Sequence, residues 1–200
     1  QTELIKLGLD SNTIVMYSSD QGFYIGDHGW YDTRWMYEES LKMPFIVKWP
    51  GVVKAGSRNS DLIQNLDYAQ TFLEIANAPK PADMQGLSLV PLLKGESPQT
   101  WRKEIYYHYY EYPSVHMIPR HYGIRTKRYK LMHFYQFGNE WEMYDLKTDP
   151  DELTNVYGKK ETLNVQKSLV KRLKNLRTYY EDDSDVSERP DYIELYRKQS

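Results

Sequence analysis

The clearest structural signal lies in residues 105–146, IYYHYYEYPSVHMIPRHYGIRTKRYKLMHFYQFGNEWEMYDL. Short runs rich in aromatic residues alternate there with polar loops such as Thr126-Lys127 and Gly138-Asn139, which is typical of strands joined by turns. This pattern predicts an antiparallel meander of three or four strands. The expected strands are Ile105–Tyr112, Tyr122–Arg125, Tyr129–Tyr135 and Trp141–Leu146.

A helix is predicted after the meander, because apolar residues recur there at helical spacing and would cover the sheet with one face. Three acids, Glu181 to Asp183, oppose the macrodipole at its C-terminal end, so we expect the helix to end there. Residues 184–200 have few apolar anchors and are interpreted as a tail. The apolar face of the helix comprises Leu169, Leu173, Leu176 and Tyr180.

The first part of the chain mixes strand-like and helical segments. Ile14 to Tyr17 form a continuous apolar run, which fits a strand buried on both faces of a parallel sheet. A second run, Phe45 to Trp49, ends at the turn signal Pro50-Gly51. Helical spacing from Asp61 to Ala76 predicts a helix with Asp61 as its cap. This alternation favours an α/β layer.

Composition narrows the class of protein. The 200 residues carry 28 acids and 26 bases, and this near-balance argues against a nucleic-acid binder. No apolar run approaches the roughly 18 residues of a membrane span. Cysteine is absent, which excludes disulfides, thiolate zinc sites and a cysteine nucleophile within these residues. The chain opens with what resembles the last turn of a helix ending at Gly8, so we expect polypeptide before Gln1.

Asp20 and Gln21 follow the first apolar run directly. Ligands of open α/β sheets bind at the carboxyl ends of strands. A carboxylate beside an amide oxygen suits Ca²⁺ or Mg²⁺, although two neighbours cannot complete a shell of about six oxygens. Asp-Gln-Gly is also an ordinary turn sequence, and the residues alone leave both interpretations open.

A loop follows Asp20 and Gln21, and its histidine, arginine and acids fit a polar functional site. It contains Asp27-His28-Gly29-Trp30, then Asp32, Arg34 and the pair Glu38-Glu39. The alternative is that the two glutamates only begin a helix and that Arg34 is solvated.

Considered together, residues 18–51, SSDQGFYIGDHGWYDTRWMYEESLKMPFIVKWPG, resemble a segment of the type I, formylglycine-dependent sulfatases. NLDYAQTFLEIANAPKPADMQGLSLVPLLKG, HYGIRTKRYKLMHFY and EMYDLKTDPDELTNVYG resemble later segments of that family, in the same order. The resemblance implies the C-terminal part of an alkaline-phosphatase-like sulfatase fold, an α/β architecture that ends in a small antiparallel sheet packed with a helix. It divides the chain into core residues 1–100, an antiparallel subdomain 101–183 and the tail.

The resemblance also assigns roles to individual residues. Asp20 and Gln21 match the pair that coordinates the active-site Ca²⁺, and His28 lies near the substrate pocket. Many relatives have Asp-Lys-Arg where this chain has Asp32-Thr33-Arg34. Thr33 therefore occupies the position of a cation that contacts sulfate, and a hydroxyl supplies no charge there. Three alternatives follow: Arg34 replaces that cation, sulfate binding is weaker, or the protein has a slightly different activity.

Two residues of the meander are candidates for substrate binding. His121 and Arg125 lie an even number of residues apart on one expected strand, so both face the same side. An imidazole and a cation on one face suit an acidic, sulfated glycan. His116 and Arg120 precede them in a loop. The alternative is that Arg125 pairs with a neighbour in the sheet and that His121 is structural.

The family nucleophile is a formylglycine made from a Cys/Ser-x-Pro-x-Arg motif, and neither Ser97 nor Ser114 fits that spacing. The resemblance therefore implies that the nucleophile, and the rest of the calcium shell, lie in an N-terminal half outside these residues. We expect these 200 residues to be inactive alone and to need that half, or another covering chain, as a partner.

The expected activity of the whole is hydrolysis of sulfate esters on carbohydrates, outside the cytoplasm. Two alternatives remain: a phosphate-ester hydrolase of the alkaline phosphatase superfamily, and a non-catalytic fragment that binds acidic glycan. The residues identify neither the sugar nor the sulfate position.

Overall fold

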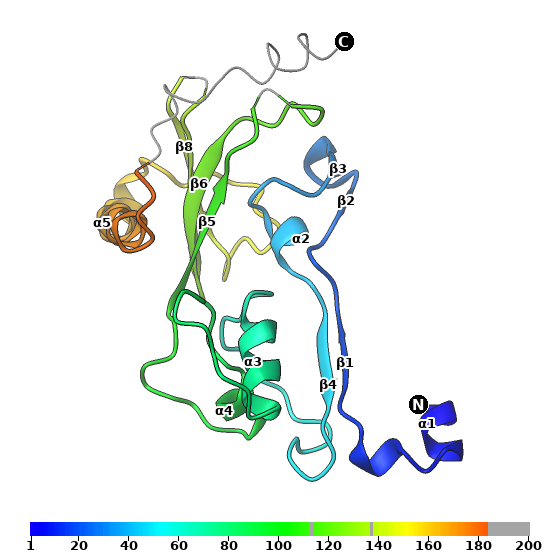
Figure 1. The fold of residues 1–200 in the computed structure, drawn as a ribbon. Helices are drawn as coiled ribbons and strands as arrows, with labels where there is room; N and C mark the ends of the chain where they lie inside the picture. Colours follow the sequence, from blue (N-terminus) through cyan, green and yellow to red (C-terminus); the bar gives the residue numbers. More distant parts are fainter. Residues whose placement is uncertain (113, 137, 184–200) are drawn as a thin grey trace, which may run out of the picture. The chain divides into compact units, whose positions relative to one another are not determined.

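The computed structural model describes residues 1–112, 114–136 and 138–183, and the predicted tail lies outside them (Figure 1). The chain forms two compact units. The first contains residues 1–20 and 43–102, and the second contains residues 21–42 together with residues from 103 onward. No helix in the described part of the chain is long and apolar enough to cross a membrane.

The first unit contains α1 (Thr2–Lys6), η1 (Asp10–Asn12), β1 (Val15–Ser18), β4 (Phe45–Lys48), α3 (Asp67–Ile75) and α4 (Val90–Leu93). β1 pairs with β4 in an antiparallel ribbon whose register joins Val15 to Lys48. Tyr17 is 63% exposed and Ile46 is 64% exposed. The prediction of a parallel strand buried on both faces is therefore wrong for the described residues. An apolar run predicts burial but carries no information on the direction of the partner strand.

α3 is shorter than predicted, and its start is held by Asp67 rather than by Asp61. The buried Asp67 carboxylate accepts hydrogen bonds from the amides of Gln64, at 2.7 Å, and Leu87, at 2.8 Å. Arg102 pairs with the same carboxylate. A buried carboxylate needs several donors of this kind, and Asp67 obtains them from three segments of the first unit.

The second unit is built on the predicted meander, which is confirmed. β5 (Glu104–Tyr109), β6 (His121–Thr126), β7 (Tyr129–Phe134) and β8 (Glu140–Asp145) form one antiparallel sheet in the order β5-β6-β7-β8. The helix predicted to cover it is α5 (Leu163–Tyr179), preceded by η3 (Lys160–Thr162). It ends just before the three acids, as expected.

Alternation along the strands gives this sheet two covered faces (Figure 1). One face packs against α5. The other packs against the segment 21–42, which contains β2 (Tyr24–Ile25), η2 (Asp27–Gly29), β3 (Tyr31–Asp32) and α2 (Glu38–Leu41). The α5 side of the core contains Ile124, Leu131, Met143, Leu169 and Leu173, and the opposite side contains Tyr24, Met36, Tyr37, Met132 and Phe134.

The compact units differ from the predicted division at residue 100 in the placement of one segment. The prediction assigned residues 21–42 to the core, whereas the structure places them in the unit that contains the antiparallel sheet. The physical reason is apolar packing: Tyr24 and Met36 in this segment are fully buried in one cluster with Met132 of β7. The sulfatase-like loop is therefore positioned by the sheet.

Candidate active-site loop

Gly22 fixes the start of the loop against α2. Its amide donates a 2.8 Å hydrogen bond to the carbonyl of Ser40. A Cβ at this position would lie 1.9 Å from the carbonyl oxygen of Glu39, a distance that no side chain tolerates. A glycine is therefore required where the two ends of the loop approach each other.

The middle of the loop is held by buried hydroxyl groups. Tyr24 donates from its hydroxyl to the carbonyl of Trp35 at 3.1 Å. Tyr37 donates to the carboxylate of Glu142 on β8 at 2.8 Å. Tyr107 on β5 donates to the carbonyl of Arg34 at 2.6 Å. Burial raises the pKa of Tyr24, Tyr37 and Tyr107, so all three remain neutral donors.

A buried group of four charges, here called the charge cluster, joins α2 to the sheet. It consists of Glu38 of α2, Arg125 of β6, Lys130 of β7 and Glu152 from the segment after β8. The Lys130 ammonium lies 3.0 Å from one oxygen of Glu38 and 2.8 Å from one oxygen of Glu152. The other oxygen of Glu152 accepts the Glu38 amide at 2.6 Å. Two cations and two anions thus neutralise each other in the core.

The two carboxylates of the charge cluster respond differently to burial. Burial opposes ionisation of Glu38, but hydrogen bonding from Arg125 and the charge of Lys130 outweigh it and lower its pKa to about 2. For Glu152 burial prevails over the attraction of Lys130, and its pKa is raised. Lys130 is therefore the group that keeps Glu152 compatible with its fully buried position.

The predicted substrate residue Arg125 belongs to this cluster. Its guanidinium makes a two-point pair with Glu38, with distances of 3.2 and 2.9 Å. This is the structural alternative raised from the sequence, with the partner on α2 rather than in the sheet. As predicted, Arg125 and His121 face the same side of β6, toward the loop.

His121 lies in the core rather than on a surface. It is 0% exposed, and rings from both the loop and the sheet surround it. Its Nδ1 lies 2.8 Å from the carbonyl of Pro119, and burial lowers its pKa to about 4. A neutral, enclosed imidazole does not fit the predicted role in binding substrate. Strand alternation gave its face correctly but could not reveal that the loop covers that face.

A second polar group, here called the Asp32 cluster, consists of Asp32, Thr33, Arg34 and His116. The Asp32 carboxylate accepts the Thr33 amide at 2.6 Å and pairs with the Arg34 guanidinium through one oxygen. The other oxygen lies 2.8 Å from Nδ1 of His116. Desolvation opposes ionisation of Asp32, but the Thr33 amide and the charges of Arg34 and His116 lower its pKa. One carboxylate therefore holds a guanidinium and an imidazole side by side, each about one-third exposed.

Thr33 is buried, and its hydroxyl is already engaged. It accepts a hydrogen bond from the Gln21 side-chain amide at 2.9 Å and lies 3.3 Å from the Arg34 guanidinium. The exposed donor of the predicted Asp32-Thr33-Arg34 element is consequently Arg34. The same contact directs the nitrogen of the Gln21 amide toward Thr33, and the oxygen is the atom of an amide that binds a metal ion.

His28 sits in a left-handed turn with φ of 52°, between two glycines that also have positive φ. Its ring stacks on Tyr37, with centroids 4.4 Å apart, and its Nε2 lies 3.4 Å from the Glu39 carboxylate. Its side chain is only 11% exposed. His28 therefore lies in the predicted loop, but its ring mainly packs the turn onto α2.

The predicted metal residues lie where the two units adjoin in sequence. Asp20 is exposed and ends the first unit, and Gln21 begins the second. Asn65 donates to the Asp20 carbonyl at 3.2 Å, which holds the backbone at this point. A carboxylate and an amide oxygen are the donor types that Ca²⁺ prefers. No group of three His, Cys, Asp or Glu side chains suited to a metal occurs among the described residues. The pair fits part of a calcium shell, and the calcium site stays a prediction.

His116 was not among the residues predicted to bind substrate, although its loop was noted. The contact with Asp32 joins the end of β3 to a loop far away in the chain, and no periodic pattern predicts such a meeting. The available signal was chemical: a histidine in a polar loop of a chain with only five histidines.

The antiparallel sheet, its C-terminal helix and the loop packed on it together define an alkaline-phosphatase-like sulfatase fold. The solved structure of BT4656 in complex with its substrate D-glucosamine-2-N,6-O-disulfate is similar to this chain, with a TM-score of 0.89 and 48% sequence identity. The match covers 94% of this chain and 38% of that structure. The phosphonate monoester hydrolase of Agrobacterium radiobacter shares the fold, with a TM-score of 0.78 and 24% identity, over 89% of this chain and 37% of the other.

The chain belongs to the family described as N-sulphoglucosamine sulphohydrolase, C-terminal, whose model matches residues 26–179. It is 50% identical over 188 residues to an N-acetylglucosamine-6-O-sulfatase of Bacteroides thetaiotaomicron. The aligned residues cover 92% of this chain and 34% of that relative. The chain thus spans about a third of the length of this relative. The sulfatase resemblance predicted from the sequence is confirmed.

Proposed function

We propose that this chain is the C-terminal part of a sulfatase that hydrolyses sulfate esters on sulfated amino sugars. The observation that carries the proposal is the Asp32 cluster, in which one carboxylate holds a partly exposed guanidinium and a partly exposed imidazole. The name of the relative at 50% identity and the substrate bound in the solved structure both support a sulfated glucosamine.

The Asp32 cluster suits a sulfated sugar chemically. Arg34 carries a planar guanidinium that can donate two hydrogen bonds to oxygens of sulfate or of the sugar. The Nδ1 of His116 faces Asp32, so its Nε2 accepts a hydrogen bond from a sugar hydroxyl when the ring is neutral and donates one to a sulfate oxygen when the ring is protonated. The ionised Asp32 is an acceptor for a sugar hydroxyl. Because Asp32 already orients both side chains, little side-chain entropy is lost when the ligand binds. Thr33 supplies no charge, and Arg34 takes the role of the cation expected in this loop.

Calcium belongs to the proposal. Asp20 and the Gln21 amide oxygen would hold the ion, with its other ligands and the formylglycine nucleophile on polypeptide outside these 200 residues. When bound, the ion supplies positive charge that polarises sulfate oxygens. Gly22 and the Gln21–Thr33 hydrogen bond hold the Gln21 side chain in the loop that carries the Asp32 cluster. We place the whole protein outside the cytoplasm, where sulfated glycans occur.

A phosphate-ester hydrolase is the second candidate, because a phosphonate monoester hydrolase shares this fold. Its 24% identity supports the fold alone. The family match and the sulfatase at 50% identity favour sulfate esters. The third candidate, a non-catalytic glycan-binding fragment, would retain the Asp32 cluster but release no sulfate.

The test is an assay of the full-length protein against D-glucosamine-2-N,6-O-disulfate, glucosamine 6-sulfate and glucosamine 6-phosphate, with released sulfate and phosphate measured by ion chromatography. We expect sulfate release that chelation of calcium abolishes and that Arg34→Ala reduces by at least about ten-fold. The matched control Arg58→Ala, at an exposed position in the first unit, should leave release unchanged. Phosphate release that exceeds sulfate release would favour the second candidate. The 200 residues alone should bind the sugar weakly and release nothing.

A further inference from the structure

α5 has a charge composition unlike the rest of the chain. Its 17 residues, LNVQKSLVKRLKNLRTY, include five basic side chains and no acidic one. The whole chain, by contrast, has a net charge of −2. Positive charge is therefore concentrated on the helix that covers the sheet face opposite the candidate active-site loop.

Three of these basic residues share one side of the helix. Lys167, Lys171 and Lys174 follow one another at spacings of four and three residues, which places them on a single stripe. All three are exposed, whereas Leu169 and Leu173 point into the core and are 2% exposed. This lysine stripe runs for about 10 Å along the side of α5 that faces away from the sheet.

The other two basic residues already have partners. Arg172 pairs with Glu104 on β5, and Arg177 lies over the ring of Tyr122 at 4.3 Å. No ion pair neutralises the lysine stripe among residues 1–112, 114–136 and 138–183. The stripe is thus a row of like charges that forms no ion pair within the described part of the chain.

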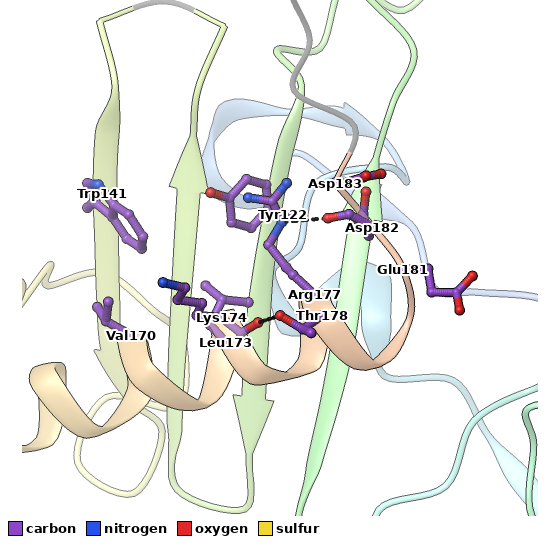
Figure 2. A pocket seen from close by; sticks show the side chains of 10 residues that line it. All are labelled: Tyr122, Trp141, Val170, Leu173, Lys174, Arg177, Thr178, Glu181, Asp182 and Asp183. Atoms are coloured by element: carbon purple, nitrogen blue, oxygen red, sulfur yellow. Dashed lines mark hydrogen bonds between the residues drawn. The ribbon is translucent and has the colours of Figure 1, made fainter.

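A hollow of about 890 Å³ adjoins the stripe at Lys174 (Figure 2). Tyr122 of β6 and Trp141 of β8, two strands separated by β7, line it together with Val170 of α5. Glu181 and Asp183 lie at its far end, beyond the last turn of the helix. Trp141 stacks on His133 and Tyr157, and Arg177 lies over the ring of Tyr122, so these rings form an apolar wall of the hollow. The row of ammonium groups beside this wall supplies the positive charge that sulfate groups require.

We propose that the lysine stripe and the adjoining hollow form a secondary binding site for a sulfated polysaccharide, separate from the Asp32 cluster. The inference rests on the proposed function, since a sulfatase that acts on glycans meets its substrate as a polyanionic chain. The stripe binds successive sulfate groups, and the hollow takes the edge of a sugar ring at Trp141. A polymer held on α5 raises the local concentration of its own ends at the catalytic site.

Binding to immobilised heparin, measured by surface plasmon resonance over a series of salt concentrations, tests this site in the full-length protein. The variant Lys167→Glu/Lys171→Glu/Lys174→Glu should bind heparin at least about ten-fold more weakly at about 0.15 M salt, with a flatter salt dependence. The control variant Lys54→Glu/Lys80→Glu/Lys94→Glu makes the same change in net charge at exposed positions of the first unit.

The control should weaken heparin binding by less than about three-fold, because only diffuse charge changes. The variant Lys167→Arg/Lys171→Arg/Lys174→Arg should preserve binding. Turnover of D-glucosamine-2-N,6-O-disulfate should be the same in the stripe variant and the unchanged protein. A failure of the sulfatase proposal would therefore appear as absent turnover in both proteins, separately from the result of the heparin binding.

Equal losses in the stripe variant and the control would overturn the proposal, because net charge alone would then explain binding. Binding of duplex DNA is the second comparison. If the protein binds DNA as tightly as heparin, and the stripe variant loses affinity for both equally, the assignment to a sulfated glycan is overturned. Heparin binding that depends on the stripe and clearly exceeds DNA binding would support it.

Discussion

Lys130→Met removes one cation from the charge cluster and leaves Glu152 buried without its partner. The Lys130 and Glu152 side chains are both 0% exposed and lie 2.8 Å apart, so solvent cannot replace the lost charge. Loss of one partner from such a pair costs about 3–5 kcal/mol of folding free energy. Because Arg125 still neutralises Glu38, and the Glu38 amide still donates to Glu152, we expect a cost near 3 kcal/mol.

Urea unfolding followed by tryptophan fluorescence measures this cost in a double-mutant cycle. Glu152→Gln keeps an acceptor for the Glu38 amide, so the double variant Lys130→Met/Glu152→Gln should recover about 2 kcal/mol relative to Lys130→Met alone. Lys94→Met, at an exposed position, is the control and should change stability by less than about 0.5 kcal/mol.

The pH dependence of Lys130→Met gives a second readout with a definite sign. Burial raises the pKa of Glu152 in the folded protein, and loss of Lys130 removes the main charge that opposes this rise. A carboxyl group with a raised folded pKa destabilises the protein most above that pKa, and this cost shrinks as pH falls from the folded pKa toward the unfolded pKa. The deficit of the variant should therefore shrink on acidification. A cost below about 1 kcal/mol, or a coupling near zero, would refute the claim that these charges depend on each other.

Three further outcomes are expected. Gly22→Ala forces a Cβ to within 1.9 Å of the Glu39 carbonyl, so it should lower the melting temperature and abolish sulfate release, and a normal melting curve would contradict the close approach. His121→Phe should keep the ring packing and leave KM unchanged, whereas a large rise in KM would restore the substrate role once predicted for His121. Asp32→Asn should remove stability that is present above the ordinary aspartate range and is lost as pH falls through the lowered folded pKa, so its deficit in unfolding free energy should be smaller at pH 3 than at pH 7, and an equal deficit at both pH values would contradict the lowered pKa.

The sequence was most informative where periodicity governs structure. Alternation and turn residues predicted the four strands of the sheet, and leucine spacing predicted α5, because these patterns report directly which side of an element is buried. They did not give the direction of the partner of β1, since an apolar run is compatible with parallel and antiparallel pairing.

The candidate site was predictable in part. The loop, Arg34 and the acid beside it followed from residue types and from the family resemblance. The charge cluster and the contact of His116 with Asp32 did not, because each depends on side chains from segments that only the folded chain brings together. His121 shows the limit most clearly, since its strand face was predicted correctly and its enclosure by Trp35 was not.

The calcium pair remains a prediction for the same reason. Asp20 and Gln21 have suitable oxygens, but a calcium shell is defined by all of its ligands, and no group of three His, Cys, Asp or Glu side chains suited to a metal ion occurs among the described residues. Calcium titration of the full-length protein, with Asp20→Asn and Gln21→Ala as variants, should show weaker binding in each. Unchanged affinity in both would remove the pair from the site.

The most direct measurement is a crystal structure of the full-length protein with D-glucosamine-2-N,6-O-disulfate bound. We predict that the Arg34 guanidinium and the free nitrogen of the His116 ring lie within about 3 Å of oxygens of the sugar or its sulfate groups. A sugar bound in the catalytic site with both side chains turned away from it would contradict the role assigned to the Asp32 cluster.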